Sequence, residues 1–185
     1  MPRWEDVAYL AVGSERQRRA HHAIEELGIL RDLARFDATL VGTIPIGIDE
    51  PDSDLDIICH ASDAAAFAAE LGRLYGSAPD FRLASAGAVT VAGFCRGGER
   101  FEVFGQDLPV REQAGFRHMV VEWRLLELGG DRLRREIRRL RRGGAKTEPA
   151  FAAALCLTGD PYQRLLELFG ASDGDLLVLL RAAGA

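Results

Sequence analysis

The chain has 185 residues, of which 48% are hydrophobic and 28% are charged, and its formal net charge is −5. This length and composition suffice for a folded core and exclude a disordered chain. The acidic balance argues against a generic nucleic-acid coat, which would be basic overall. Neither a signal-peptide pattern at the start nor an apolar run of roughly 18 residues is present, so we expect a soluble protein without a membrane span.

The cysteines indicate the compartment. Cys59, Cys95 and Cys156 are odd in number, lie far apart and form no C-x-x-C pair. A disulfide framework or a zinc site is therefore not expected, and a reducing, cytoplasmic environment fits best.

The first elements in chain order are a helix and a strand. Ser14 predicts the N-cap of a helix that runs to about Leu27, and Gly28 predicts its end. After a short apolar segment, residues 37–41 are predicted to form a buried strand, which leads into a stretch rich in turn residues, 42–53.

A second strand and a second helix follow. Residues 54–59 alternate acidic and apolar side chains, as a strand with one face on a core does. An alanine-rich helix is predicted over residues 62–75, with Ser62 or Asp63 as its N-cap.

Residues 87–105 are predicted to form a β-hairpin. Two β-like runs flank Gly97 and Gly98, and glycine suits a two-residue turn in which both positions need positive φ. Counting outward from that turn places Glu102 opposite Gly93. A glycine in mid-strand leaves open space beside the carboxylate, which suits close approach by a ligand.

From residue 109 onward the strand signals cease and successive segments predict helices. Asp160 and Pro161 suit the N-cap and first-turn positions of one of these helices. The sequence therefore predicts two regions, an α/β core over residues 1–108 and a helical region over residues 109–185 packed on that core.

Two aspartates carry the clearest chemical signal. Asp54 and Asp56 are two residues apart on a predicted strand, so both carboxylates project from the same face. Carboxylates held this close repel each other unless a cation lies between them. A hard divalent cation is the natural partner, and oxygen-only ligands favour Mg²⁺.

Phosphate-binding groups are expected just upstream, where the 37–41 strand ends at Gly42 and Thr43. The glycine allows close approach of the backbone, and the neighbouring hydroxyl and amide can hold phosphate oxygens. Glu102 is the candidate third acid, with Glu99 and Asp107 as rivals. An EF-hand loop is excluded because Ile57 stands where that loop requires glycine.

These residues resemble the polymerase-β-like nucleotidyltransferase superfamily. The family pattern is Gly-Gly or Gly-Ser, about ten residues, Asp-x-Asp between apolar residues, and a third acid on a later strand. Here ten residues (44–53), the last of them Ser53, separate Gly42-Thr43 from Asp54-Leu55-Asp56, and Glu102 follows. Thr43 departs from the usual serine, and its added methyl group bears on how a triphosphate fits.

The resemblance implies an α+β nucleotidyltransferase fold, with a mixed β-sheet flanked by helices and a helical C-terminal half. It also implies that Asp54, Asp56 and Glu102 bind Mg²⁺ and catalyse transfer, and that Gly42, Thr43 and Ser53 bind the nucleotide. A closer resemblance, carried by residues 42–59, 113–119 and 145–151, is to an uncharacterised bacterial family within the superfamily, and it supplies no substrate.

Two functions remain open at this point. The first is Mg-dependent transfer of a nucleoside monophosphate from an NTP to the hydroxyl of an unknown acceptor, which could be a small molecule, a protein or RNA. The alternative is a protein of the same fold that binds a nucleotide or a protein partner without turnover, such as a toxin–antitoxin component.

Basic residues give weaker signals. Lys146 is the single lysine of the chain, beside the expected N-cap Thr147 of a helix that begins at Glu148, so it is a candidate phosphate ligand. The arginine-rich segment 132–142 carries an apolar stripe and predicts an amphipathic helix, with phosphate or RNA contact as the alternative. His118 is expected to make a structural hydrogen bond.

Overall fold

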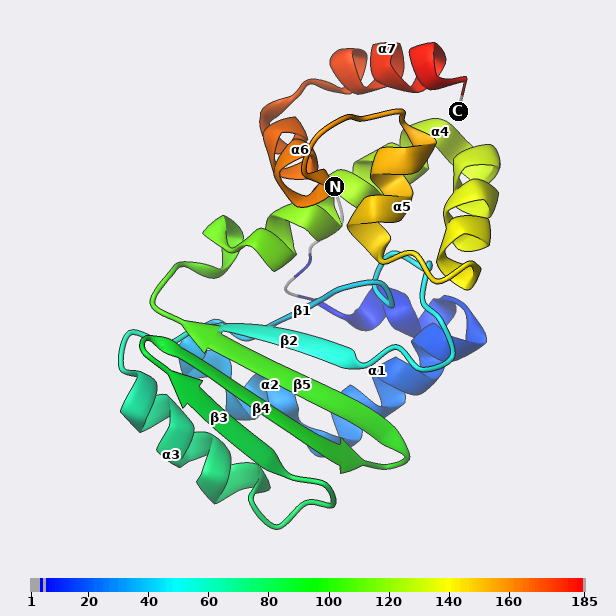
Figure 1. Ribbon diagram of the computed structural model, residues 1–185. Helices are drawn as coiled ribbons and strands as arrows, with labels where there is room; N and C mark the ends of the chain where they lie inside the picture. The colour runs from blue at the N-terminus through cyan, green and yellow to red at the C-terminus, as the bar shows by residue number, and fades with distance from the viewer. Residues whose placement is uncertain (1–3, 5, 185) are drawn as a thin grey trace. The chain divides into compact units, whose positions relative to one another are not determined.

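The computed structural model describes residues 4 and 6–184 (Figure 1). The chain divides into two compact units. The first consists of the residues up to Gly47 together with Asp52–Gln113, and the second consists of Ile48–Pro51 and Ala114–Ala185.

A five-stranded mixed sheet forms the centre of the first unit, in the order β1-β2-β5-β4-β3. Strands β2 and β5 pair in parallel, and every other neighbouring pair is antiparallel. The strands are β1 (Thr39–Val41), β2 (Leu55–His60), β3 (Arg82–Ala86), β4 (Val89–Arg96) and β5 (Glu99–Gln106).

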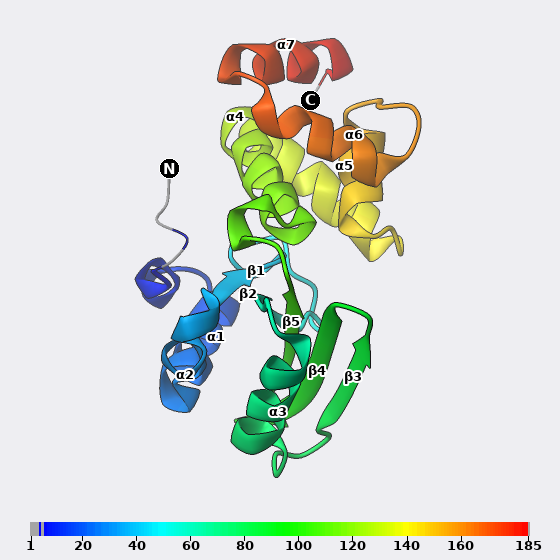
Figure 2. The ribbon, with the colours of Figure 1, turned by 90° about the vertical axis from the view of Figure 1, so that its left-hand side faces the viewer.

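Helices cover one face of this sheet, as Figures 1 and 2 show. They are α1 (Glu15–Leu27), α2 (Ile29–Asp32) and α3 (Ala64–Tyr75), with short 3₁₀ turns at Ala8–Val12, Ala34–Phe36 and Val110–Glu112. The core lies between the helices and the inward side chains of the strands, among them Ile57, Phe101 and Val103. The opposite face of the sheet therefore carries the alternate residues, including Asp56 and Glu102.

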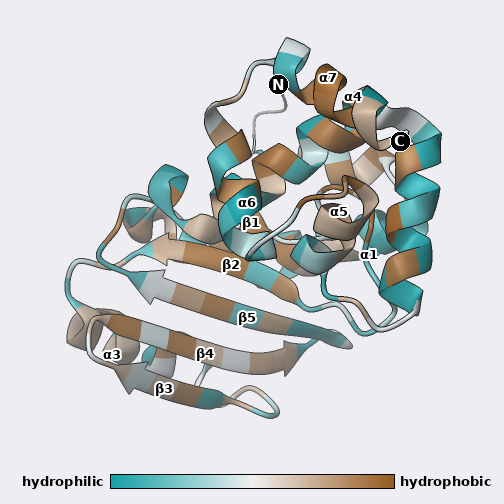
Figure 3. Cartoon of the chain, turned by 45° about the horizontal axis from the view of Figure 1, so that its top comes forward, coloured by the Kyte–Doolittle hydropathy of each residue, from teal (hydrophilic) through white to brown (hydrophobic). Residues whose placement is uncertain are grey.

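Close packing of α3 on β5 depends on Gly105. A Cβ atom at this position would lie 2.2 Å from Cε1 of Phe67 in α3, so a larger residue would push the helix away from the sheet. In Figure 3, β2 is hydrophobic along most of its length and hydrophilic near its start, where Asp56 is the second residue of the strand.

Local signals explain most boundaries in the first unit. Ser14 and Gln17 form a capping box at the start of α1, and Gly28 ends the helix with a φ of 71°. Asp63 caps α3 through Ala66 N–H. The predicted hairpin is confirmed: Gly97 and Gly98 have φ of 59° and 77°, and Gly93 lies opposite Glu102.

Three strand predictions need correction. Strand β1 begins at Thr39 because Asp37 has a φ of 54°, which is incompatible with an extended strand. Strand β2 begins at Leu55, so Asp54 directly precedes it. Strand β3 was not predicted, because its five residues are all exposed and show no alternation.

The second unit is helical. Its elements are α4 (Ala114–Arg142), α5 (Thr147–Ala154), α6 (Pro161–Glu167), a 3₁₀ turn at Leu168–Gly170 and α7 (Asp173–Ala183). Gly130 interrupts α4 with a φ of 59°, which separates the two helices that the sequence predicts there. Asp160 caps α6 through Gln163 N–H, and Pro161 opens that helix, as expected.

The arginine-rich part of α4 is the predicted amphipathic helix. Leu133 and Ile137 are fully buried, and Arg139 pairs with Glu136 one turn earlier at 2.7 Å. Arg141 donates a hydrogen bond to the carbonyl of Ile48, which ties the Ile48–Pro51 segment to this unit.

His118 of α4 makes the structural hydrogen bonds that the sequence predicts. Its Nε2 lies 3.0 Å from the carbonyl oxygen of Tyr162, and its Nδ1 lies 3.3 Å from Oε1 of Glu148. Glu122, one turn further along α4, is buried, and this burial together with the Glu148 carboxylate raises its pKa to about 8. A network of buried polar groups thus joins α4 to α5 and α6.

The expected cap of α5 is wrong by one residue. Lys146 takes the extended N-cap conformation and Thr147 is already helical. The N-cap residue Lys146 makes no side-chain capping hydrogen bond at this N-terminus. Within the described residues, no helix has the length and apolar character needed to cross a bilayer.

Candidate functional site

The register of the sheet brings two of the three candidate acids together. Asp56 of β2 and Glu102 of β5 are direct partners in the parallel pair, and both lie on the face of the sheet opposite α1, α2 and α3 (Figure 2). Neighbouring strands are about 4.8 Å apart, so these side chains leave the sheet side by side. Residues separated by 46 positions in the chain therefore meet at one point.

Gly42 forms the wall on the other side of Asp56. Val41 of β1 pairs with Asp56, and the chain turns at Gly42 with a φ of 85°. A Cβ atom at Gly42 would lie 2.4 Å from Oδ2 of Asp56. Glycine is thus required at position 42 for two reasons, which are the positive φ and the close approach of the Asp56 carboxylate.

Burial and, after it, electrostatic repulsion shape the protonation of Asp56. Burial, followed by the charges of Glu102 and Asp54, raises the pKa of its carboxyl to about 7. A carboxyl destabilised in this way gains from any cation that lies between it and its neighbours.

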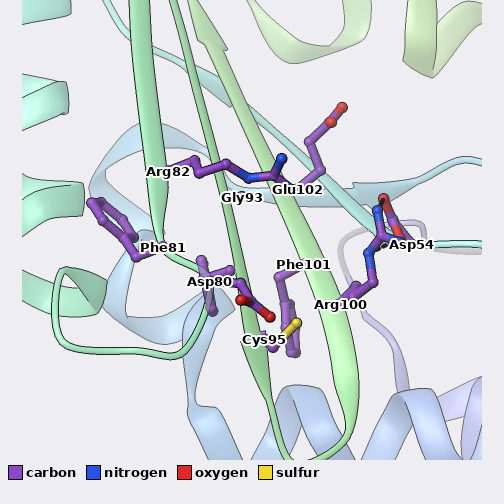
Figure 4. Close-up of a pocket in the computed structure, with 10 residues that line it drawn as sticks. Asp54, Asp80, Phe81, Arg82, Gly93, Cys95, Arg100, Phe101 and Glu102 are labelled. Atoms are coloured by element: carbon purple, nitrogen blue, oxygen red, sulfur yellow. Dashed lines mark hydrogen bonds and ion pairs between the residues drawn. The ribbon is translucent and has the colours of Figure 1, made fainter.

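Asp54 has a different partner. Nε of Arg100 lies 3.1 Å from its Oδ1, and a guanidinium nitrogen of the same arginine donates to Oδ2 at 3.3 Å. Arg100 lies on β5 two residues before Glu102, on the same face of the strand. Figure 4 shows the Arg100 guanidinium beside the Asp54 carboxylate, whereas Glu102 extends away from them. Arg100 thus neutralises the Asp54 carboxylate.

Arg100 pairs with one of the three candidate metal ligands, Asp54. Among residues 4 and 6–184, no group of three His, Cys, Asp or Glu side chains is arranged so that it could hold a metal ion. The donor chemistry still fits a hard cation, since all three candidates are carboxylates and Asp56 is destabilised by its acidic neighbours. For Asp54, Asp56 and Glu102 to bind one cation together, Asp54 would have to break its ion pair with Arg100.

The predicted nucleotide-binding hydroxyls are neighbours. Oγ1 of Thr43 lies 3.4 Å from Oγ of Ser53, so the two ends of the long turn between β1 and β2 meet. Helix α1 supports both ends: Arg16 donates to the carbonyl of Ser53 at 3.0 Å, and Gln17 donates to that of Ile44 at 3.0 Å. These two α1 residues are positioning residues that the sequence did not single out.

Both rivals of Glu102 have other partners. Glu99 points to the helical side, where it pairs with Arg16 at 2.7 Å. Asp107 follows the far end of β5 and pairs with His60 at 3.2 Å. Neither carboxylate lies in the row that contains Asp56, so Glu102 stays the candidate third acid.

A groove on the open face of the sheet adjoins the acids. It encloses about 700 Å³, and its lining includes Asp54, Asp80, Arg82, Gly93, Arg100 and Glu102 (Figure 4). Sequence reasoning missed Arg82 because β3 was not recognised. Arg100 could have been found from its spacing of two from Glu102, which places both on one strand face.

Lys146, the remaining candidate, belongs to the second unit as the N-cap residue of α5. Burial raises the pKa of Glu148, but its hydrogen bond to His118, its backbone hydrogen bond and the charges of His118 and Lys146 together lower that pKa below its ordinary value. Lys146 thus has an electrostatic role within its own unit.

Solved structures share this fold. The Cid1 poly(U) polymerase with MgGTP bound matches with a TM-score of 0.58 and 10% identity, over 83% of this chain and 49% of that one. GLD-2 in its complex with RNP-8 matches with a TM-score of 0.58 and 12% identity, over 91% of this chain and 77% of that one. A cytoplasmic RNA terminal U-transferase matches with a TM-score of 0.51 and 13% identity, over 82% and 46%.

These likenesses show that the chain has the polymerase-β-like nucleotidyltransferase fold, as the sequence resemblance implied. The chain spans about half the length of the poly(U) polymerase. The family model described as a domain of unknown function, DUF4269, matches residues 22–168, and the chain belongs to this family. No curated protein matches the chain.

The raised pKa of Asp56 makes stability depend on pH. Folded Asp56 holds its proton up to about pH 7, whereas the unfolded chain releases it near pH 4, so its contribution to stability is lost as pH rises through this window. We expect Asp56→Asn to raise the free energy of unfolding of the metal-free protein at pH 8 by up to about 4 kcal/mol, and to change it little at pH 4. Urea unfolding across this range measures the difference.

Asp52→Asn is the matched control, since Asp52 is exposed four residues earlier and carries the same charge. It should leave the pH profile unchanged. An Asp56→Asn profile parallel to that of the parent would show that Asp56 is not under electrostatic strain.

Proposed function

We propose that this protein transfers a nucleoside monophosphate from an NTP to an acceptor hydroxyl in a Mg²⁺-dependent reaction. The observation that carries the proposal is the row formed by Asp56 and Glu102, beside the Gly42 turn, on the face of the sheet that no helix of the first unit covers. The fold shared with nucleotidyl-transferring polymerases supports it.

In this proposal the residues have separate roles. Asp54, Asp56 and Glu102 hold Mg²⁺, and Gly42, Thr43 and Ser53 bind the triphosphate. The cation, when bound, neutralises charge on the phosphates and on the attacking and leaving oxygens. The fixed turn between β1 and β2 then contributes mainly by positioning the nucleotide.

The reaction is an in-line substitution at the α-phosphorus. The acceptor oxygen forms a bond to this phosphorus, and the bond to the bridging oxygen of pyrophosphate breaks, with its electron pair leaving on pyrophosphate. The hydroxyl proton passes to Glu102, which lies at the open edge of the row.

Since all three cysteines are free thiols, which a reducing compartment preserves, we place the reaction in the cytoplasm.

A non-catalytic protein that binds a nucleotide or a partner is the second candidate. It is favoured by the ion pair between Arg100 and Asp54, because a permanent arginine at this position would replace the metal. Transfer separates the candidates: purified protein with labelled NTP, Mg²⁺ and cell extract should yield a labelled product, and a binder yields none.

Mg²⁺ should strengthen NTP binding in the parent by tenfold or more, the scale of one charge-assisted interaction. Asp54→Asn and Asp56→Asn should each abolish this enhancement while leaving the metal-free fold intact. Calorimetric titration of each NTP, with and without Mg²⁺, measures the difference, and Asp52→Asn is the control. Equal Mg²⁺ enhancement in the parent and both site variants would place the metal elsewhere.

Lys146 is proposed as a further phosphate ligand, because a compact ammonium suits a single phosphate oxygen. Lys146→Arg keeps the charge but changes its shape, so it should weaken triphosphate binding by roughly 1–2 kcal/mol, about tenfold. Arg132→Ala, which removes an exposed charge from the same unit, should have no effect. Equal affinity in the parent, Lys146→Arg and Lys146→Ala would remove Lys146 from the site.

A further inference from the structure

Glu102 stands between two different surroundings. On one side β5 pairs with β2, where Asp56 and the Gly42 turn lie. On the other side β5 pairs with β4. The cross-strand row that contains Glu102 continues there through Gly93 of β4 to Arg82 of β3. The groove is lined by Gly93 and Arg82 on this second side, and it also reaches Asp54 and Arg100.

The fold does not require a glycine at position 93. Its φ lies outside the positive region. A Cβ atom there would meet only the carbonyl oxygen of Phe101, at 3.8 Å, which is ordinary contact. A β-branched residue would suit a central strand better. The glycine at position 93 therefore matters for the groove, because the absence of a side chain leaves the groove floor beside Glu102 open.

Arg82 extends over this open floor in the direction of Glu102 (Figure 4). Its side chain is exposed, and among the described residues no carboxylate lies within ion-pair distance of it. Asp80, an acid that also lines the groove, is hydrogen-bonded to Cys95. Burial of Cys95 and this hydrogen bond raise the pKa of the Cys95 thiol. The Arg82 guanidinium thus faces the groove with its N–H donors and has no carboxylate partner among the described residues.

Arg100 lies at the other end of the groove. It is paired with Asp54, and its side chain remains 60% exposed. If Asp54 turns toward a cation, the Arg100 guanidinium is left facing the groove. Two guanidinium groups would then flank Glu102 and Gly93, and such groups bind phosphate through paired hydrogen bonds.

From this arrangement we infer that the groove is the acceptor site and that its ligand is a phosphate ester with a free hydroxyl. This inference rests on the proposed transfer reaction and names its acceptor class. Arg82 and Arg100 hold the phosphate over Gly93, and the hydroxyl lies against Glu102. A volume of about 700 Å³ falls within the size range of small-molecule sites. The same chemistry is presented by the 3′ end of RNA and by a small phosphorylated alcohol.

Binding of two probes to the nucleotide-free protein with Mg²⁺ present, the condition under which Asp54 is inferred to release Arg100, tests the inference. They are a 5′-labelled tetra-adenylate with a free 3′-hydroxyl, measured by anisotropy, and ribose 5-phosphate, measured by calorimetry. The parent should bind at least one of them, and inorganic phosphate should compete. Binding of the oligonucleotide alone identifies an RNA end, and binding of ribose 5-phosphate identifies a small acceptor.

Gly93→Val fills the floor, and Arg82→Gln removes the free guanidinium, so each should weaken probe binding at least tenfold. Ala84→Val is the matched control, because Ala84 is exposed on the same face of β3 outside the groove lining, and it should bind as the parent does. All three should bind Mg·NTP like the parent, which separates this inference from the proposed function. Probe affinity unchanged in both groove variants, or no binding of either probe by the parent, would overturn it.

Discussion

The parallel pairing of β2 with β5 is the constraint on which the site depends. This pairing makes Asp56 and Glu102 direct neighbours, and antiparallel pairing with β1 brings Gly42 against the same aspartate. The sheet is held in register by its inner face, where residues such as Ile57, Phe101 and Val103 are buried under the helices. A slip of one residue would exchange core and site residues along the whole strand, so packing of the core fixes the chemistry on the opposite face.

Assembly of the acidic site costs free energy of folding, and burial of the hydrophobic core offsets this cost. Buried and repelled by two neighbours, Asp56 has a pKa near 7, and Asp54 is neutralised by Arg100. Functional sites often keep such local conflicts because the ligand relieves them. In the proposed function the conflict between carboxylates favours a cation, which would take the place of Arg100 beside Asp54. On this reading, Arg100 would leave Asp54 for the acceptor when the metal binds.

Much of this arrangement could be predicted from local patterns. The Gly97-Gly98 turn set the register of β4 and β5, and therefore the pairing of Gly93 with Glu102, because both turn positions need positive φ. The pairing of β2 with β5 could not be read locally, because parallel partners are distant in sequence and no turn fixes them. The resemblance to the nucleotidyltransferases implied only that Glu102, on a later strand, joins the two aspartates. Strand β3 and Arg82 were missed because an exposed edge strand carries no hydrophobic alternation.

The central claim is that Asp56 and Glu102 hold the same divalent cation, with Asp54 released from Arg100. The most direct measurement is a crystal structure with Mn²⁺ and a non-hydrolysable NTP, examined for anomalous scattering. A Mn²⁺ peak should lie between the Asp56 and Glu102 carboxylates, with Asp54 turned away from Arg100 and the triphosphate at Gly42 and Thr43. A nucleotide bound without a peak there, while Arg100 still pairs with Asp54, would contradict the account.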